Sequence, residues 1–153
     1  MRVPRRLWRW MHLAQVPLAR NPRAPIGRLV LLLTTVGRRS GRKRVTPLQY
    51  EEVEGTIFVA SARGEKADWF KNLVACPQVH VQVGTRQLDA VAEPITDPAR
   101  IADFLELRLE RHPIMMGMMM LLEGVGPRPS RAQLEDAAAR LALAALHPVG
   151  TSK

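Results

Sequence analysis

Residues 29–50 read LVLLLTTVGRRSGRKRVTPLQY, in which a strongly basic loop separates two short apolar runs. The runs at 29–36 and 45–50 are rich in Leu and Val, which is typical of buried strands. Five of the seven residues at 38–44 are basic. Gly37 and Gly41 would let backbone N–H groups curl around an anion while the guanidiniums clamp it from outside. The stretch therefore predicts a hairpin whose tip captures a strongly anionic ligand, with a merely solvated turn as the alternative.

The composition is that of one globular domain with a surface that attracts polyanions. The chain has 153 residues and a formal net charge of +9. Such a charge favours nucleic acid, anionic lipid or an acidic cofactor as the partner. We expect no specific nucleic acid, because the chain has only seven aromatic residues and no nucleic-acid-binding motif. A non-enzymatic protein that binds nucleic acid or another anionic ligand is nevertheless an alternative function.

The sequence gives no indication of a metal site. Cys76 is the single cysteine, so we expect neither an intrachain disulfide nor a thiolate metal site. The four histidines are far apart and lack the spacing of metal ligands.

The first 20 residues predict an amphipathic helix that carries several arginines and two tryptophans. Leu7, Trp10 and Met11 share one face of that helix. We expect the helix to pack over one end of the domain, and peripheral contact with an anionic membrane is the alternative. No cleavable leader or membrane-spanning run is evident, so the expected location is the cytoplasm or the inner face of the cell membrane.

The rest of the chain predicts an antiparallel sheet with helical insertions. Strands are expected at 45–53, 56–61, 79–83 and 86–93, with turns at 54–55 and 84–85. Helices are expected at 66–75 and 96–111, the second capped by Asp97. A C-terminal helix is expected at 130–147, because Ser130 and Gln133 form a capping-box pattern. The order of elements indicates a single α+β domain, 1–153, built on a small barrel of about six strands.

Three motifs in this order resemble the deazaflavin-dependent nitroreductase family. They are LLLTTVGRRSG with RVTPL at 31–48, VASARG with DWFKNL at 59–73, and CPQVHVQVG at 76–84. The resemblance covers about 29–93 and implies a split β-barrel that uses the reduced deazaflavin F420. This cofactor carries a phosphodiester and an oligoglutamate tail, so it is the kind of anion that the basic loop would bind. FMN on the same barrel is the alternative, although its short phosphate would require fewer arginines.

The resemblance also assigns roles along the cofactor. Arg38, Arg39 and Ser40 are expected at the phosphate and tail, with Arg44 as a second clamp. The other residues expected at the cofactor are Thr46, Pro47 and Leu48 beside the ring, Ala60, Ser61, Ala62 and Arg63 in the facing loop, and Trp69 and Asn72 on the inserted helix. Simpler interpretations remain for Ser40 as a turn residue and for Trp69 as core.

The acceptor side departs from the nitroreductase pattern. The family places tyrosines after the long helix, whereas this chain has methionines there and only Tyr50 elsewhere. We expect Met115 and Met118 to line an apolar pocket for a quinone-like or unsaturated lipid-like acceptor. Core packing under the helices at the rim of the barrel is the other interpretation of these methionines. His112 is a candidate proton donor for the acceptor, although a helix-end histidine is the more common explanation. Glu51, Glu52 and Glu54 are interpreted as an exposed strand end and turn.

Overall fold

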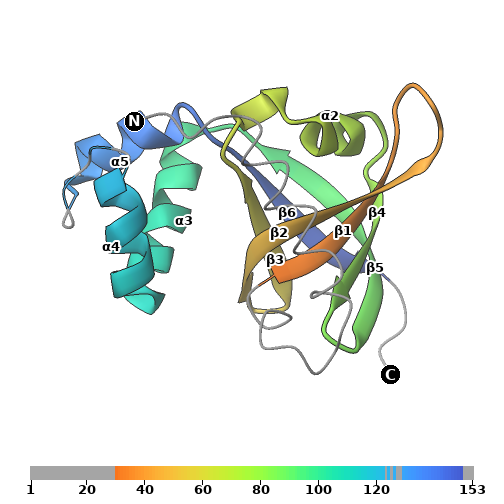
Figure 1. Ribbon diagram of the computed structural model, residues 1–153, viewed down its shortest axis with the longest axis horizontal. Coiled ribbons are helices and arrows are strands. Elements are labelled where there is room, and N and C mark those ends of the chain that lie inside the picture. The colour runs from red at the N-terminus through yellow and green to blue at the C-terminus, as the bar shows by residue number, and fades with distance from the viewer. Residues whose placement is uncertain (1–29, 123, 125, 127–128, 150–153) are drawn as a thin grey trace.

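The computed structural model describes residues 30–122, 124, 126 and 129–149. Within these residues six antiparallel strands close into a barrel in the order β1-β2-β3-β6-β5-β4 (Figure 1). The strands are β1 (Val30–Val36), β2 (Lys43–Val53), β3 (Thr56–Ser61), β4 (Gln78–Val83), β5 (Arg86–Ile95) and β6 (Ala142–Val149). The α+β split barrel expected from the sequence is confirmed.

Alternation along each strand fills the barrel with apolar side chains. Neighbouring residues of a strand point to opposite faces, so every second side chain enters the interior. Leu31 on β1 lies opposite Leu48 on β2, and both belong to one buried cluster. The same cluster continues through Ile57, Val59, Val79, Val81, Ala90, Ala92, Ala142, Ala144 and Leu146. The outward residues of β2, which include Gln49 and Glu51, therefore face away from this core.

A short helical segment lies across one end of the barrel, beside the hairpin tip (Figure 1). It consists of a 3₁₀ turn, η2 (Gly64–Lys66), and helix α2 (Asp68–Ala75). Phe70 and Leu73 of α2 are buried in the same cluster as the barrel interior. The single helix expected at 66–75 is thus divided at Ala67, which has an extended backbone.

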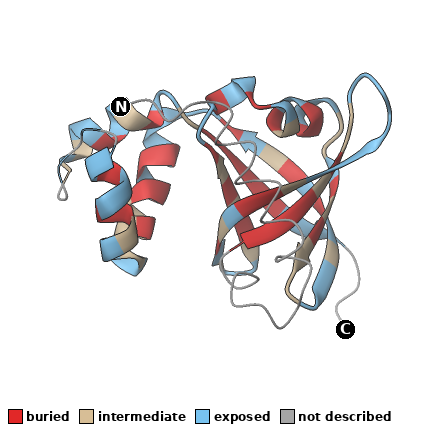
Figure 2. Cartoon of the chain, in the orientation of Figure 1, coloured by how far each residue is buried: buried red, intermediate tan, exposed pale blue. Residues whose placement is uncertain are grey.

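In the part of the chain that the structure describes, three further helices form a second layer outside the barrel: α3 (Pro98–Arg111), α4 (Pro113–Leu122) and α5 (Arg131–Ala138). Ile101, Phe104 and Leu105 of α3 join outward residues of β5 and β6 in a second apolar cluster. The helix face towards the barrel is accordingly buried (Figure 2). The expected cap of α3 is present, since the Asp97 side chain accepts a hydrogen bond from the Ala99 N–H.

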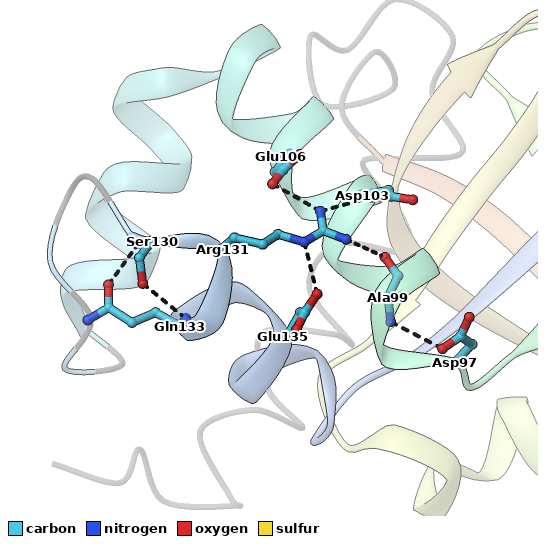
Figure 3. Close-up of polar contacts among 8 residues, drawn as sticks. All are labelled: Asp97, Ala99, Asp103, Glu106, Ser130, Arg131, Gln133 and Glu135. Carbon is cyan, nitrogen blue, oxygen red and sulfur yellow. Dashed lines mark hydrogen bonds and ion pairs between the residues drawn. The ribbon is translucent and has the colours of Figure 1, made fainter.

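Polar contacts fix α5 against α3 (Figure 3). The capping box of Ser130 and Gln133 begins α5 where the sequence indicates. Arg131 then lies within 3.0 Å of carboxylate oxygens of Asp103 and Glu106 on α3 and of Glu135 on its own helix. Loss of Arg131 would remove the ionic link between the two helices.

The prediction of a C-terminal helix at 130–147 is correct only for its first two turns. Helix α5 ends at Ala138, and residues 142–149 form strand β6 between β3 and β5. Ala and Leu favour helices, and this strand is buried on both faces over Ala142–Leu146, so it shows no polar alternation. Smaller differences are that β5 continues through Pro94 to Ile95 and that α4 was not expected as a separate helix. The amphipathic helix expected at 1–20 lies outside the described residues.

Candidate functional site

The hairpin tip between β1 and β2 is a tight, closed loop. The Gly37 N–H donates to the Arg42 carbonyl, and the Gly41 N–H donates to the Gly37 carbonyl, each at 2.8 Å. A Cβ at Gly37 would lie 2.6 Å from the Ser40 hydroxyl oxygen, and Gly41 has a φ of +68°. The turn therefore requires glycine at position 41, whereas a Cβ at position 37 would displace the Ser40 hydroxyl. The N–H groups of Gly37 and Gly41 are both used within the loop, so these two are not available to an anion.

Arg38 joins the loop to helix α2. Its backbone N–H and its Nη1 both donate to the Asn72 side-chain oxygen, at 3.2 and 2.8 Å. Its Nη2 lies 3.3 Å from a carboxylate oxygen of Asp68. Asn72 is buried, so its amide is held in one orientation. The structure thus brings together Arg38 and Asn72, which were expected to share a site, and adds Asp68, which sequence reasoning missed.

The other basic residues of the tip are free to meet an anion. Arg39, Arg42, Lys43 and Arg44 are exposed, and none forms an ion pair with another described residue (Figure 2). Ser40 accepts a hydrogen bond from the Arg42 N–H at 3.2 Å, which is the contact of a turn residue. The tip therefore fits a multiply anionic group through its exposed basic side chains.

The segment that follows β3 is shaped by its own internal contacts. The buried Ser61 hydroxyl donates to the Gly64 carbonyl at 2.8 Å. A Cβ at Gly64 would lie 2.9 Å from the Arg140 carbonyl oxygen, so this close approach requires glycine. Ala62 and Arg63 are exposed and Ala60 is half-buried. Of these expected cofactor neighbours, Arg63 has an exposed positive charge that is available to an anion. The Ser61 hydroxyl instead stabilises the turn through its hydrogen bond to Gly64.

The residues expected beside the ring lie on both faces of β2. Leu48 belongs to the barrel core, and Pro47 is buried on the opposite face. Thr46 is half-buried. Trp69 on α2 is half-buried against the barrel core, with its ring 5.9 Å from that of Phe70. Leu48 and Trp69 thus both contribute to packing.

The other end of β2 carries a buried charge cluster that the sequence did not reveal. Glu51 is only 5% exposed, so its interpretation as part of an exposed strand end is wrong. One of its carboxylate oxygens lies 2.6 Å from His112 Nε2 and 3.4 Å from Arg108 Nε, and the other lies 3.1 Å from Arg111 Nη1. Glu52 and Glu54 are exposed as expected, and Glu52 pairs with Arg86 at 2.9 Å.

A cavity of about 160 Å³ lies beside this cluster. Its wall is formed by Gln49, Tyr50, Glu51, Glu52, Arg108, His112 and Met115. Burial lowers the pKa of the Arg108 guanidinium, and the nearby Glu51 carboxylate opposes that effect. The pKa of Tyr50 is raised by burial and by the charges of Glu52 and Glu51. Two residues expected on the acceptor side, His112 and Met115, therefore share a wall with the chain's only tyrosine.

Met118 does not share that cavity. Its side chain is 63% exposed, together with Ile114, Leu121 and Leu122 on the outer side of α4. Met116 and Met120 are buried against the helical layer instead. The methionine run thus contributes to the core, to one cavity wall and to an exposed apolar face.

The two groups of candidate residues lie far apart along one strand. Glu51 lies seven positions after Arg44 on β2, which corresponds to about 23 Å at ~3.3 Å per residue. In the described part of the chain no helix is long and apolar enough to cross a membrane. No group of three potential metal ligands is found among the same residues.

The barrel places this protein in the class of split-barrel folds. A solved F420-H2 dependent reductase is 25% identical with a TM-score of 0.55, over 78% of this chain and 95% of that one. A Listeria innocua structure described as a pyridoxamine 5'-phosphate oxidase is 12% identical with a TM-score of 0.54, over 80% and 85%, and shares the fold alone.

The sequence comparisons then define the family. The model of the F420H(2)-dependent quinone reductase family matches residues 17–114, so the chain belongs to that family. It is 34% identical over 68 residues to a Mycobacterium tuberculosis F420H(2)-dependent quinone reductase, covering 42% of this chain and 46% of the relative. A second protein of that organism, named in the same class, is 38% identical over 76 residues, covering 46% of this chain and 64% of the relative. The aligned region therefore spans less than two thirds of either relative. The family confirms the resemblance to deazaflavin-dependent enzymes.

Proposed function

We propose that this protein is an F420H2-dependent oxidoreductase that reduces an apolar acceptor, quinone-like or unsaturated and lipid-like. The observation that carries the proposal is the group of exposed basic side chains at the β1–β2 tip. The tip is attached to α2 by the hydrogen bonds from Arg38 to Asn72. Family membership supports the choice of F420 as the anion.

In this proposal the protein binds the cofactor, orients its ring and keeps water away from it. Arg39 and Arg44 would hold the phosphate and carboxylate groups of the cofactor, each contact contributing ~1.5–3 kcal/mol. The Arg38–Asn72 contact would keep the tip in place, so that less ordering is required on binding. When bound, the deazaflavin supplies a hydride, and the surrounding side chains determine its orientation and exclude water.

The acceptor side of the proposal rests on α4 and the residue before it. Met115 lines a cavity and Met118 belongs to an exposed apolar face, which suits an apolar acceptor. A proton must accompany the hydride, and His112 is the side chain that we propose as its donor. We further propose that the acceptor reaches the protein from a membrane, because helix α4 exposes five large apolar side chains and contains no charged residue.

Fluorescence titration of the cofactor-free protein with F420 tests the proposal. We expect Arg39→Ala and Arg44→Ala each to weaken binding about tenfold, since ~1.4 kcal/mol corresponds to one decade. Arg100→Ala is a matched control, because Arg100 is an exposed arginine of the outer layer paired with Glu93. FMN is titrated in parallel. Unchanged F420 affinity in both loop variants, or tighter binding of FMN, would overturn the assignment.

A further inference from the structure

Helix α2 places a carboxylate beside the basic side chains of the hairpin tip. Asp68 is the first residue of α2, and its Oδ1 lies 3.3 Å from Arg38 Nη2. Among the described residues, Arg38 is the only basic residue of the tip that has such a partner. Asp68 therefore brings a negative charge to the place where the proposed function puts an anion.

The stability of the fold does not explain this ion pair. The side chain of Asp68 is 80% exposed and that of Arg38 is 25% exposed, and a pair with so much contact with water contributes little to stability. The dipole of α2 favours an acidic residue in its first turn, but it requires no contact with Arg38. The tip is already attached to α2 through Asn72, which accepts hydrogen bonds from the backbone N–H and from Nη1 of Arg38.

Arg38 keeps donors that a ligand could use. A guanidinium has five N–H groups, and the contacts with Asn72 and Asp68 use one on Nη1 and one on Nη2. A ligand oxygen bound to another N–H of the same planar group would lie ~6 Å from the Asp68 carboxylate. An anion at Arg38 is thus attracted by the guanidinium and repelled by Asp68.

The strength of that repulsion depends on the charge of the phosphate. At ~6 Å in water, the repulsion between two unit charges lowers affinity about threefold. A terminal phosphate, as in FMN, carries nearly two negative charges at neutral pH, whereas the phosphodiester of F420 carries one. Asp68 is therefore expected to weaken FMN binding about tenfold and F420 binding about threefold.

We propose that Asp68 is a specificity-determining residue of the cofactor site, which favours the phosphodiester of F420 over the phosphate dianion of FMN. A site can gain specificity by repelling the wrong ligand as well as by attracting the right one. The inference rests on the proposed function, because it requires the tip to bind the phosphate of the cofactor. Asp68 holds neither cofactor, and it makes the more highly charged phosphate bind more weakly.

The chain offers a matched control in the outer helical layer. Asp103 on α3 lies 2.8 Å from Arg131 Nη1, and its side chain is 70% exposed. Like Asp68, it is an exposed aspartate paired with an arginine (Figure 3). Figure 1 shows α3 on the opposite side of the barrel from the hairpin tip. Asp103→Asn therefore reports on the general effect of removing one exposed negative charge.

The test is titration of the cofactor-free protein with F420 and with FMN, followed by the fluorescence of each cofactor. Asp68→Asn should tighten FMN binding about tenfold and F420 binding about threefold. Asp68→Glu, which keeps the charge, and Asp103→Asn should each leave the ratio of the two affinities within about twofold of the wild type. Circular dichroism confirms folding, and Asp68→Ser removes the same charge if Asp68→Asn does not fold.

Salt separates a charge effect from a structural one. In about 1 M salt the Debye length falls to ~3 Å, so the difference between Asp68→Asn and the wild type should disappear. A difference that persists in high salt would contradict the electrostatic role of Asp68.

The outcomes also separate this inference from the proposed function. Equal changes in the two affinities in Asp68→Asn, or no change in either, would overturn the role of Asp68. Where the wild type does not bind FMN measurably, FMN binding by Asp68→Asn supports the inference and its absence contradicts it. F420 binding that is lost in Arg39→Ala and Arg44→Ala would then leave the proposed function intact. Tighter binding of FMN than of F420 by the wild type would contradict the proposed function, while the ratio of Asp68→Asn to wild type would still report on Asp68.

Discussion

The basic side chains near the two ends of strand β2 differ in burial and in ion pairing. At the hairpin tip, Arg39 and Arg44 are exposed and form no ion pair with another described residue. At the far end, Arg108, Arg111 and His112 converge on the single buried carboxylate of Glu51. Exposed charges without partners cost little stability and are available to a ligand, whereas buried charges depend on one another. The comparison predicts that substitutions at the tip affect binding and that substitutions at the far end affect stability as well.

The largest expected effect is on stability at the far end. Glu51→Ala should lower the free energy of unfolding by about 3–5 kcal/mol, because Arg108 would remain buried without its counter-charge. Urea denaturation measures the change. The neighbouring Glu52→Ala removes only an exposed pair with Arg86 and should cost less than about 1 kcal/mol. Equal losses in the two variants would contradict the distinction between the ends.

The next effect is on cofactor affinity at the tip. The double variant Arg39→Ala/Arg44→Ala should bind F420 about 100-fold more weakly if the two contacts are independent. Added salt should weaken wild-type binding more than binding by the double variant, because exposed charges are screened. Isothermal titration at two salt concentrations checks both statements. Stability should change by less than about 0.5 kcal/mol.

A smaller effect is expected where the tip meets α2. Asn72→Ala removes the acceptor for two hydrogen bonds from Arg38 and should cost about 1–2 kcal/mol of stability. Faster amide exchange at residues 37–41 would show that the loop has lost its attachment. Lys71→Ala, an exposed neighbour on the same helix, serves as the control. Unchanged exchange in Asn72→Ala would mean that the loop is held by its own turn.

The smallest effect concerns Glu93, an exposed glutamate that pairs with His147 as the buried Glu51 pairs with His112. Hydrogen bonds from His147 and Arg100 lower the pKa of the Glu93 carboxyl below its usual range. A lowered folded-state pKa contributes stability above the ordinary value, and this is lost as pH falls through the folded value. Glu93→Gln should therefore flatten the acid side of the stability profile, by well under about 1 kcal/mol after screening. Thermal unfolding between pH 3 and pH 6 (roughly, the acidic carboxyl range) measures it.

The sequence could predict most of the barrel because its signals are local. The hairpin at 29–50, the turn at Glu54 and Gly55, and the caps at Asp97 and Ser130 all depend on neighbours in the chain. Strand β6 could not be predicted in this way. Its Ala- and Leu-rich residues favour a helix, and the strand forms because β3 and β5 provide partners on both sides.

The candidate site, like the barrel, could be predicted from the sequence only in part. The excess of arginine at the tip is visible in the sequence, because charge composition needs no tertiary partner. The contact of Arg38 with Asn72 joins residues 34 positions apart, and that of Glu51 with Arg111 joins residues 60 apart. No local pattern encodes such pairs, so the sequence alone predicts an exposed Glu51.

The sequence by itself determined the strands, the basic tip and the family likeness, because periodicity, turn chemistry and charge are properties of neighbouring residues. Only the tertiary structure decided that the chain closes through β6 and that Glu51 is buried against the α3–α4 junction. Both outcomes depend on which distant surfaces meet, and burial rather than local preference sets their energy.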